Sequence, residues 1–366
     1  MLTLYALECG HGDTLLLSMP GGKWALVDCK LPGKATRENF FRLANRLGIL
    51  RLDYVVLTHP DFDHYAGMWA VLEHFSTEDR SLGFYCDSGH SPESVLKLLA
   101  AQNTPPDEVE EFVRLVKTRV ALYQKGKLKR HLANDQVPYL REVGIGGVNR
   151  RVFGMFPIAP SWGLQGTATD TTLLEGKSDT QPNDLSVVLV VRWASGKGKV
   201  HRLLLPGDAE GVCLDFALQT WASHEHNVDK EQGFDLIKVP HHGSTNRHDV
   251  SLCRTIAAPG RSVAVISCGT HYGLPAREVL ADYLRHGWRV FSMCVRHPPG
   301  PGGLGSPGIP RCALRDFHQR GRSSPSVPAS RMDVVVRLGP RMKQPNVSPT
   351  SAGISTGDLP HYVGRR

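Results

Sequence analysis

Four side chains of the kinds that bind metal ions lie within six residues of one another: His59, Asp61, Asp63 and His64. They follow residues 54–57, a β-branched and aromatic run with the composition of a buried strand. Capping a following helix needs only one such residue, so a loop that holds four is better explained by metal binding. We therefore expect a metal site where this strand ends.

Three further predicted buried strands, at residues 200–205, 234–239 and 263–268, also end in side chains that bind metals or move protons. These side chains are Asp208, the adjacent pair His241 and His242, and His271. Loops at the ends of strands are where functional groups gather on a rigid sheet. We expect these groups to meet the first cluster at one edge of the fold.

The combined ligand set suits two divalent ions. One ion would be held by His59 and Asp61, the second by Asp63, His64 and either His241 or His242, with Asp208 between them. Two ions about 3.5–4 Å apart can lower the pKa of a bound water and stabilise charge on a phosphoryl or acyl centre. Because carboxylates form half of this set, Mn²⁺ competes with Zn²⁺ as the expected metal.

Several polar residues in turns and at strand ends are expected to support or extend this cluster: Asp13, Asp28, His90, Asn183, Ser186 and Ser244. Asp13 and Asp28 suit a role in orienting a metal-bound histidine. Turn chemistry explains Asp13 about as well. His90 follows a predicted strand in a Gly/Ser loop, where it is either a further ligand or an ordinary polar residue.

The elements that position these groups alternate between strands and helices, an order typical of α/β layering. Strands are predicted at 15–18, 24–28 and 187–193, and helices at 37–48 and 68–75. Residues 106–134 favour a charged helix that is acidic at its start and basic later, as the helix dipole prefers. Residues 160–182 are rich in Gly, Thr, Ser and Asp and predict a loop.

Length and composition exclude several classes. At 366 residues and 41% hydrophobic content, the chain is long enough for one large or two ordinary domains. No apolar run approaches the roughly 20 residues of a membrane span, and the start lacks the features of a secretory signal. Its eight cysteines form no CxxC pair, which argues against a zinc ribbon or a redox motif. We expect a cytoplasmic protein without membrane segments.

The net charge of +8 belongs to the C-terminal part of the chain. Residues 297–366 contain ten Lys and Arg against three Asp and Glu, whereas residues 1–296 are nearly neutral. This extension is rich in Pro and Gly and predicts one strand, at 331–338, before a disordered tail after Gly339. Its charge would suit a polyanion such as nucleic acid, or simply a solvated end.

The motifs resemble those of the metallo-β-lactamase superfamily, and most closely the hydrolase domain of the ComEC-type competence proteins. The resemblance is carried by Gly10-His-Gly-Asp13, Leu26-Val-Asp28, Thr58-His-Pro-Asp-Phe-Asp-His64, Asn183-Asp-Leu-Ser186, Leu205-Pro-Gly-Asp208 and Val239-Pro-His-His-Gly-Ser244. It extends over about residues 2–295. It implies an α/β protein, a metallo-β-lactamase-like αββα sandwich, with a dinuclear site and hydrolytic chemistry. The hydrolase domain would span 1–296, with an inserted helical and loop region at about 104–182.

Three features depart from that family pattern. His11 stands where the family usually has Gln, and Leu274 stands where it has a histidine. The substitution at Leu274 affects a substrate-side or general-acid contact, a place that His271 would have to fill. The long membrane segments of the competence proteins are absent here, so the resemblance does not imply DNA uptake.

Our main hypothesis is a metal-dependent hydrolase, a phosphodiesterase or nuclease in which a hydroxide held between two ions attacks phosphorus. Asp63, His242 and His271 are the expected catalytic residues. One alternative is hydrolysis of a small-molecule ester, lactone or phosphorylcholine-type substrate, since one site of this kind supports many reactions. Another is a partner-gated effector or binding module in a multi-protein system, for example one of defence. The partners and the oligomeric state stay open.

Overall fold

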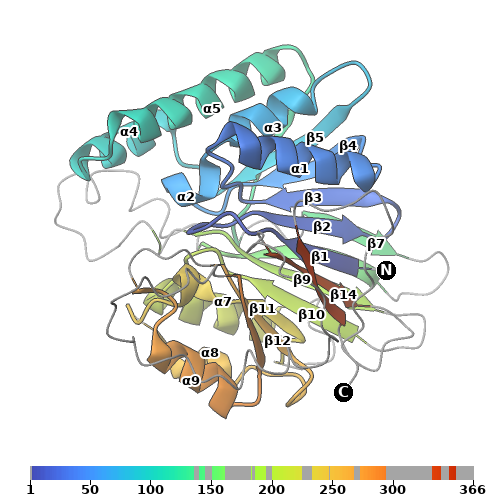
Figure 1. The fold of residues 1–366 in the computed structure, drawn as a ribbon, viewed down its shortest axis with the longest axis vertical. Helices are drawn as coiled ribbons and strands as arrows, with labels where there is room; N and C mark the ends of the chain where they lie inside the picture. Colours follow the sequence, from blue (N-terminus) through green and yellow to red (C-terminus); the bar gives the residue numbers. More distant parts are fainter. Residues whose placement is uncertain are drawn as a thin grey trace, which may run out of the picture.

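The computed structural model describes residues 2–135, 140–144, 151–160, 183, 186–194, 200–224, 233–246, 248–267, 273–293, 332–338 and 346–351. Two β-sheets pack face to face, and helices cover the outer face of each sheet (Figure 1). The predicted α/β architecture, an αββα sandwich, is thereby confirmed. Among the described residues, no helix is both long and apolar enough to cross a lipid bilayer.

The first sheet has the strand order β15-β14-β1-β2-β3-β4-β5-β6. Its strands are β1 (Leu2–Ala6), β2 (Leu15–Met19), β3 (Lys23–Val27), β4 (Arg51–Val56), β5 (Ser81–Asp87), β6 (Lys129–Leu132), β14 (Met332–Leu338) and β15 (Asn346–Ser351). Strands β3 to β6 are parallel to their neighbours in this group. Their carboxyl ends therefore share one edge of the sheet, where the loop with His59 begins.

The second sheet has the order β13-β12-β11-β10-β9-β8-β7. Its strands are β7 (Arg141–Gly144), β8 (Arg151–Ala159), β9 (Val188–Ala194), β10 (Val200–Leu205), β11 (Leu236–Lys238), β12 (Val263–Ile266) and β13 (Arg289–Ser292). Strands β10 to β13 run parallel. The residues that follow β10, β11 and β12 thus emerge together.

Helices α1 (Lys34–Arg46), α3 (Met68–His74), α4 (Pro92–Ala101) and α5 (Pro106–Gln124) lie on the side of the first sheet, and α7 (Gly211–Ser223), α8 (Val250–Cys253) and α9 (Arg277–Arg285) lie on the side of the second (Figure 1). The short helix α2 (Phe62–Tyr65) follows β4 at the edge where the loops gather. In α1, Phe40 and Ala44 are four residues apart and therefore share the buried face.

Alternation along the strands separates the core into layers. Leu15 and Leu17 of β2 pack between the two sheets, whereas Leu16 packs under the helices of the first sheet. On β10, Leu203 and Leu205 face the space between the sheets, and Leu204 faces the helices of the second. Each fully buried Leu contributes roughly 1.5–3 kcal/mol relative to an exposed one, so this pattern fixes which strand face is turned inward.

Two regions differ from the sequence-based expectations. The described part of the predicted insertion at 104–182 contains β6, β7 and β8, which are members of the two sheets. The predicted charged helix at 106–134 ends at Gln124, because Gly126 adopts a left-handed φ and the chain then enters β6.

The C-terminal region also differs. The sequence predicts a strand at 331–338, and β14 pairs there with β1. It predicts disorder after Gly339, yet β15 pairs with β14 and forms the edge of the sheet. The division into a domain at 1–296 and an extension at 297–366 stays a prediction.

Candidate metal centre

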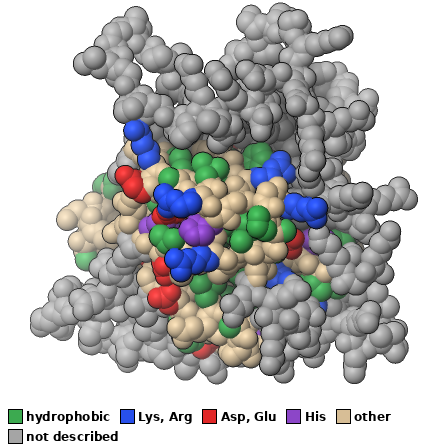
Figure 2. Space-filling view, turned by 90° about the horizontal axis from the view of Figure 1, so that it is seen from below, with side chains coloured by type: hydrophobic (Ala, Val, Ile, Leu, Met, Phe, Trp, Pro, Cys, Tyr) green, Lys and Arg blue, Asp and Glu red, His purple; other side chains and the backbone are tan. Residues whose placement is uncertain are grey.

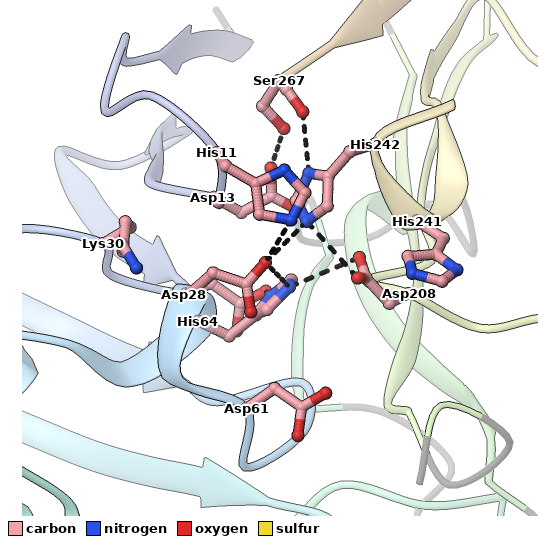
Figure 3. A network of polar contacts seen from close by, with 12 residues as sticks. His11, Asp13, Asp28, Lys30, Asp61, His64, Asp208, His241, His242 and Ser267 are labelled. Atoms are coloured by element: carbon pink, nitrogen blue, oxygen red, sulfur yellow. Dashed lines mark hydrogen bonds and ion pairs between the residues drawn. The ribbon is translucent and has the colours of Figure 1, made fainter. Parts of the chain in front are cut away.

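Four ligand atoms from Asp63, His64, Asp208 and His242 lie within 4.8 Å of one another at the shared edge of the two sheets; Figure 3 labels the last three. His242 Nε2 is 2.9 Å from Asp63 Oδ2 and 3.3 Å from Asp208 Oδ2. His64 Nε2 is 3.3 Å from Asp208 Oδ1 and 3.7 Å from Asp63 Oδ2. Two imidazoles and two carboxylates thus face a common centre.

Close backbone packing places Asp63 and His64. The turn before β2 approaches so closely that a Cβ on Gly12 would lie 2.4 Å from the Asp63 carbonyl oxygen, and Asp13 N donates to that oxygen at 3.0 Å. Gly207 approaches Thr58 in the same way, since its Cβ would lie 2.7 Å from Thr58 Oγ1. Glycine at both positions lets the loops meet and brings Asp208 to the loop after β4.

Left-handed backbone at two successive histidines turns their rings apart. After β11 the chain enters a short 3₁₀ turn, Pro240–Gly243, in which φ is 43° at His241 and 51° at His242. Such angles are costly for a bulky residue and persist only where the surroundings impose them. Here His242 points to Asp63 and Asp208, while His241 Nδ1 contacts Glu210 Oε1. Figure 3 shows the two rings turned in different directions.

The second ring nitrogen of each central histidine is fixed by a partner. His64 Nδ1 donates to Asp28 Oδ2 at 2.8 Å, and the same carboxylate accepts from the Thr58 amide and hydroxyl. His242 Nδ1 donates to the Ser267 carbonyl at 2.7 Å. Donation through Nδ1 makes Nε2 of both rings the nitrogen that can bind a metal at the centre, the arrangement that metal-binding histidines use.

His59, Asp61 and His90 lie beside this centre. The His59 and His64 rings are 4.1 Å apart, and His59 Nε2 is 3.4 Å from Asp61 Oδ2. Burial lowers the pKa of His90, and the neighbouring Asp87 opposes this shift. The predicted first-ion pair His59 and Asp61 is therefore assembled, next to the second group.

His11 belongs to the same centre although the sequence singled it out only as a departure from the family pattern. Its Nε2 is 3.4 Å from Asp63 Oδ2, and its ring lies 4.3 Å from that of His242. Burial, and then the charge of His242, lower the pKa of His11 to about 4. His11 is thus neutral near pH 7 and is one wall of the centre.

The central groups perturb one another's protonation strongly. Burial opposes charge on Asp63, but contact with His64 and His242 outweighs it and lowers the pKa of this carboxyl well below its usual range. Burial likewise opposes charge on His242, yet Asp208 raises its pKa to about 9. The pKa of His64 is raised above its usual range by Asp208 and Asp63 despite burial. Both imidazoles therefore favour the charged form beside these carboxylates.

The donor set fits a divalent metal. Within the described structure, His59 Nε2, His64 Nε2 and Asp208 Oδ1 are buried and make no hydrogen bond. Neighbouring ligand atoms around a tetrahedral zinc ion with bonds of about 2.0–2.2 Å are about 3.3–3.6 Å apart. The four separations between the imidazole Nε2 atoms and the carboxylate oxygens span 2.9–3.7 Å. They are close enough to that spacing for an ion to replace protons on these imidazoles.

A pocket of about 470 Å³ opens onto the centre. It is lined by His11, Asp61, Asp63, Asp208, His241 and Ser244, together with neighbouring residues. Because His241 Nδ1 contacts Glu210, Nε2 is the nitrogen left to face this pocket. Ser244 Oγ accepts a bond from the Asn246 amide and still has its own hydrogen to donate. The pocket therefore offers ligand carboxylates together with hydrogen-bonding groups.

The remaining predicted residues are placed as follows. Asn183 accepts a hydrogen bond from the Ser186 amide through its carbonyl, and Ser186 is buried. Asp13 is buried and pairs with Lys238. His271 lies outside the described residues, so its expected catalytic role stays a prediction.

Sequence reasoning assigned no role at the centre to several polar groups that support it: Thr58, Glu210, Lys238 and Ser267. Glu210 is 4% exposed and sits directly before α7, where an acidic residue is explained as a helix start. Lys238 is the last residue of an apolar strand, a common place for a solvated lysine. A usable signal for Lys238 was the strand alternation, which assigns it to the same inward face as Leu236.

Comparison with known proteins agrees with this architecture. The model of the metallo-beta-lactamase superfamily matches residues 7–103, which contain the loop from His59 to His64. Together with the four-layer arrangement, this match identifies the metallo-β-lactamase fold. No curated protein matches the chain at a significant level.

Solved structures also resemble the chain, at low identity. The metallo-beta-lactamase fold protein YhfI from Bacillus subtilis is 13% identical with a TM-score of 0.40, over 80% of this chain and 96% of that one. A diphosphatase from the PhnP family is 14% identical with a TM-score of 0.40, over 80% and 95%. A long form RNase Z from yeast is 10% identical with a TM-score of 0.36, over 84% of this chain and 39% of that one.

Proposed function

We propose that this protein is a metal-dependent hydrolase that cleaves phosphodiesters, with two divalent ions held at the shared edge of its sheets. The observation that carries the proposal is the convergence of Asp63, His64, Asp208 and His242 within 4.8 Å beside the pocket. We further infer, from the motifs named above, that the chain is a free-standing relative of the ComEC-type hydrolase domain.

The protein's own residues would hold the ions and the substrate. Asp63, His64, Asp208 and His242 would hold one ion, and His59 with Asp61 would hold a neighbouring one, with Asp208 proposed as the ligand shared between them. Zn²⁺ or Mn²⁺ bound there would lower the pKa of a water and stabilise the charge that develops on phosphorus. Asp28 and the Ser267 carbonyl keep the two central imidazoles in the tautomer that binds metal.

Two polar groups of the pocket lining could contact a bound phosphodiester. Ser244 can donate a hydrogen bond from its hydroxyl group, and His241, held by Glu210, presents its second nitrogen. Such groups can contact the non-bridging oxygens of a phosphodiester once bound cations balance the carboxylates. On the described part of the face in Figure 2, basic and acidic side chains are interspersed, so charge there does not favour long nucleic acids over short phosphodiesters.

The test combines metal content with hydrolysis in one preparation of the wild type and of Asp208→Ala. Substrates are bis-(p-nitrophenyl) phosphate, single- and double-stranded DNA, and a p-nitrophenyl carboxylic ester, with Zn²⁺ or Mn²⁺ restored after chelation. Asp53→Asn serves as a matched control because Asp53 is a buried carboxylate that pairs with Lys23 and Arg51 away from the centre. We expect about two ions per chain and metal-restored phosphodiester cleavage, both reduced by Asp208→Ala and kept by the control.

Other outcomes separate the alternatives. Cleavage of the ester alone would replace the phosphodiester proposal by a small-molecule hydrolase. Bound metal without cleavage of any substrate would favour a partner-gated effector, and DNA retention that survives Asp63→Ala would favour a binding module. Absence of bound metal in the wild type would contradict the ligand assignment itself.

A further inference from the structure

A fully buried lysine lies beside the candidate metal centre. Lys238 is the last residue of β11 and is 1% exposed. Two positions earlier, Leu236 packs in the core between the sheets, whereas Ile237 packs on the outer face under the helices. Because side chains alternate along a strand, Lys238 is on the face that points between the two sheets.

The ammonium group joins the two sheets at the centre. Lys238 Nζ is 2.5 Å from Asp13 Oδ2 and 3.9 Å from Asp208 Oδ1. Asp13 belongs to the glycine turn between β1 and β2 of the first sheet, while Lys238 ends β11 and Asp208 follows β10 of the second. One cation therefore contacts a carboxylate of each sheet, and one of the two is a candidate metal ligand.

A chain of hydrogen bonds extends this contact to a second candidate ligand. Asp13 Oδ1 accepts from Ser267 Oγ, and the Ser267 carbonyl accepts from His242 Nδ1 at 2.7 Å. Lys238 thus lies within ion-pair distance of Asp208 and reaches His242 through Asp13 and Ser267, both of which are shown in Figure 3.

We propose that Lys238 is a positioning residue for the metal centre, which holds Asp208 and, through Asp13 and Ser267, His242 in the arrangement that binds the ion. This inference rests on the proposed function. A buried ammonium is costly unless it is paired, and an apolar side chain such as that of Leu236 would fill the inward position without this cost. The carboxylates that Lys238 positions offset the cost of burying its ammonium group.

The lysine also suits the charge of the site. Its partner Asp13 is buried, and Asp208 lies close enough for attraction but too far for a hydrogen bond. Burial opposes the charged form, but Asp13 and Asp208 outweigh it and raise the pKa of Lys238. At 3.9 Å from Asp208 Oδ1, the ammonium group makes no hydrogen bond to Asp208 and leaves its oxygens available to a metal ion.

The experiment compares Lys238→Met, Asp13→Asn and the double variant with the wild type. Asp13→Asn keeps an oxygen that can accept from Ser267 and removes the charge that Lys238→Met would leave unpaired. Zn²⁺ affinity is measured by competition with a chromophoric chelator, and thermal unfolding is measured on the metal-free proteins. Lys23→Met is the control, because it removes an ion pair with Asp53 away from the centre.

We expect Lys238→Met to weaken Zn²⁺ binding about 10–100-fold, the usual effect of losing an outer-shell partner. The double variant should recover thermal stability yet bind Zn²⁺ about 10-fold more weakly than the wild type, a deficit of the order of known outer-shell losses. Lys23→Met should bind Zn²⁺ as the wild type does. If Lys238→Met does not fold, the double variant carries the test.

Two results would overturn the inference, and they differ. If the wild type binds Zn²⁺ and the double variant binds it equally well, Lys238 only supports the fold and the proposed function stands. If the wild type itself binds neither Zn²⁺ nor Mn²⁺, the proposed function fails and the positioning role fails with it.

Discussion

Asp87 and Asp63 lie at the carboxyl ends of two neighbouring parallel strands, β5 and β4, and they contact different kinds of side chain. Asp87, at the end of β5, accepts from Arg119 at 3.0 Å, from Arg130 at 3.1 Å and from the Gly89 amide at 3.0 Å. Asp63, in the loop after β4, faces Nε2 of His242, His11 and His64 at 2.9, 3.4 and 3.7 Å. One carboxylate meets guanidinium groups and the other meets imidazoles.

The difference in partner decides what each carboxylate can do. Arginine does not lose its proton in proteins, so Asp87 is locked in permanent ion pairs that support the fold. Imidazoles can lose their protons, and a divalent cation can then replace those protons between the same atoms. A buried carboxylate is thus a sign of metal binding only where its neighbours can become ligands.

Replacing Asp63 or Asp87 by asparagine should give the largest difference between the two roles. Asp63→Asn should abolish measurable binding at the central group, a loss of at least about 100-fold in Zn²⁺ affinity, because it exceeds the effect of losing an outer-shell partner. Asp87→Asn should leave Zn²⁺ affinity within about 2-fold but destabilise folding by about 3–5 kcal/mol, because Arg119 loses its buried partner. Calorimetric Zn²⁺ titration and chemical unfolding measure these two effects. An equal loss of Zn²⁺ affinity in both variants would refute the distinction.

The adjacent histidines give a second, smaller contrast. His242→Ala removes a candidate ligand and should weaken Zn²⁺ binding by at least about 100-fold, again more than an outer-shell loss. His241→Ala should change Zn²⁺ affinity by less than about 3-fold, because its Nδ1 contacts Glu210 and its ring is turned toward the pocket. Equilibrium dialysis with metal analysis distinguishes them. A stronger loss in the His241 variant would assign that histidine to the ion instead.

Replacing the partner of His64 should have an intermediate effect. Asp28→Asn loses the carboxylate oxygen that holds His64 Nδ1, and we expect Zn²⁺ affinity to fall about 10–100-fold. Because Asp28 also accepts hydrogen bonds from the Thr58 amide and hydroxyl, Asp28→Asn should lower thermal stability as well. Thr58→Val is the control for that part, since it removes the hydroxyl contact alone. Identical Zn²⁺ affinities in both variants would mean that Asp28 acts only on the loop.

Stability of the metal-free protein should depend on pH in a defined window. His242 has a pKa of about 9 in the fold, raised from 6.5. Its stabilising contribution is therefore complete below about pH 6.5 and is lost as the pH rises through about 9, by at most about 3 kcal/mol. Unfolding of chelator-treated protein between pH 6 and 10 measures this loss. His242→Gln should flatten the profile, and an unchanged slope in that variant would contradict the assignment.

The stability that bound Zn²⁺ adds should rise with pH in the lower part of this pH range, opposite to the trend in the metal-free protein. A metal-bound imidazole must be neutral, so Zn²⁺ binding releases protons and strengthens as the pH rises. The Zn²⁺-induced increase in melting temperature should therefore grow between pH 6 and 8.

The fold was predictable because its strands are short apolar runs, each ending in glycine-rich or polar loops. The loop after β4 was predictable because it places four metal-binding side chains within six residues, more than helix capping or a turn requires. Strand β15 was missed because its sequence contains Pro349 and polar residues, and pairing with β14 outweighs that composition.

The supporting groups were harder to predict because their contacts join distant parts of the chain. Ser267 and Asp13 are 254 residues apart, and His242 and Asp63 are 179 apart. Residue spacing carries no information on such pairs. The choice between His241 and His242 depends on left-handed backbone angles that only the packed turn imposes.

The most direct measurement is anomalous X-ray diffraction from crystals grown with Zn²⁺ or Mn²⁺. We predict an anomalous peak within bonding distance of Asp63, His64, Asp208 and His242, with a second near His59 and Asp61. Peaks elsewhere, or none at these residues with saturating metal, would contradict the assignment of this edge of the sandwich as a metal centre.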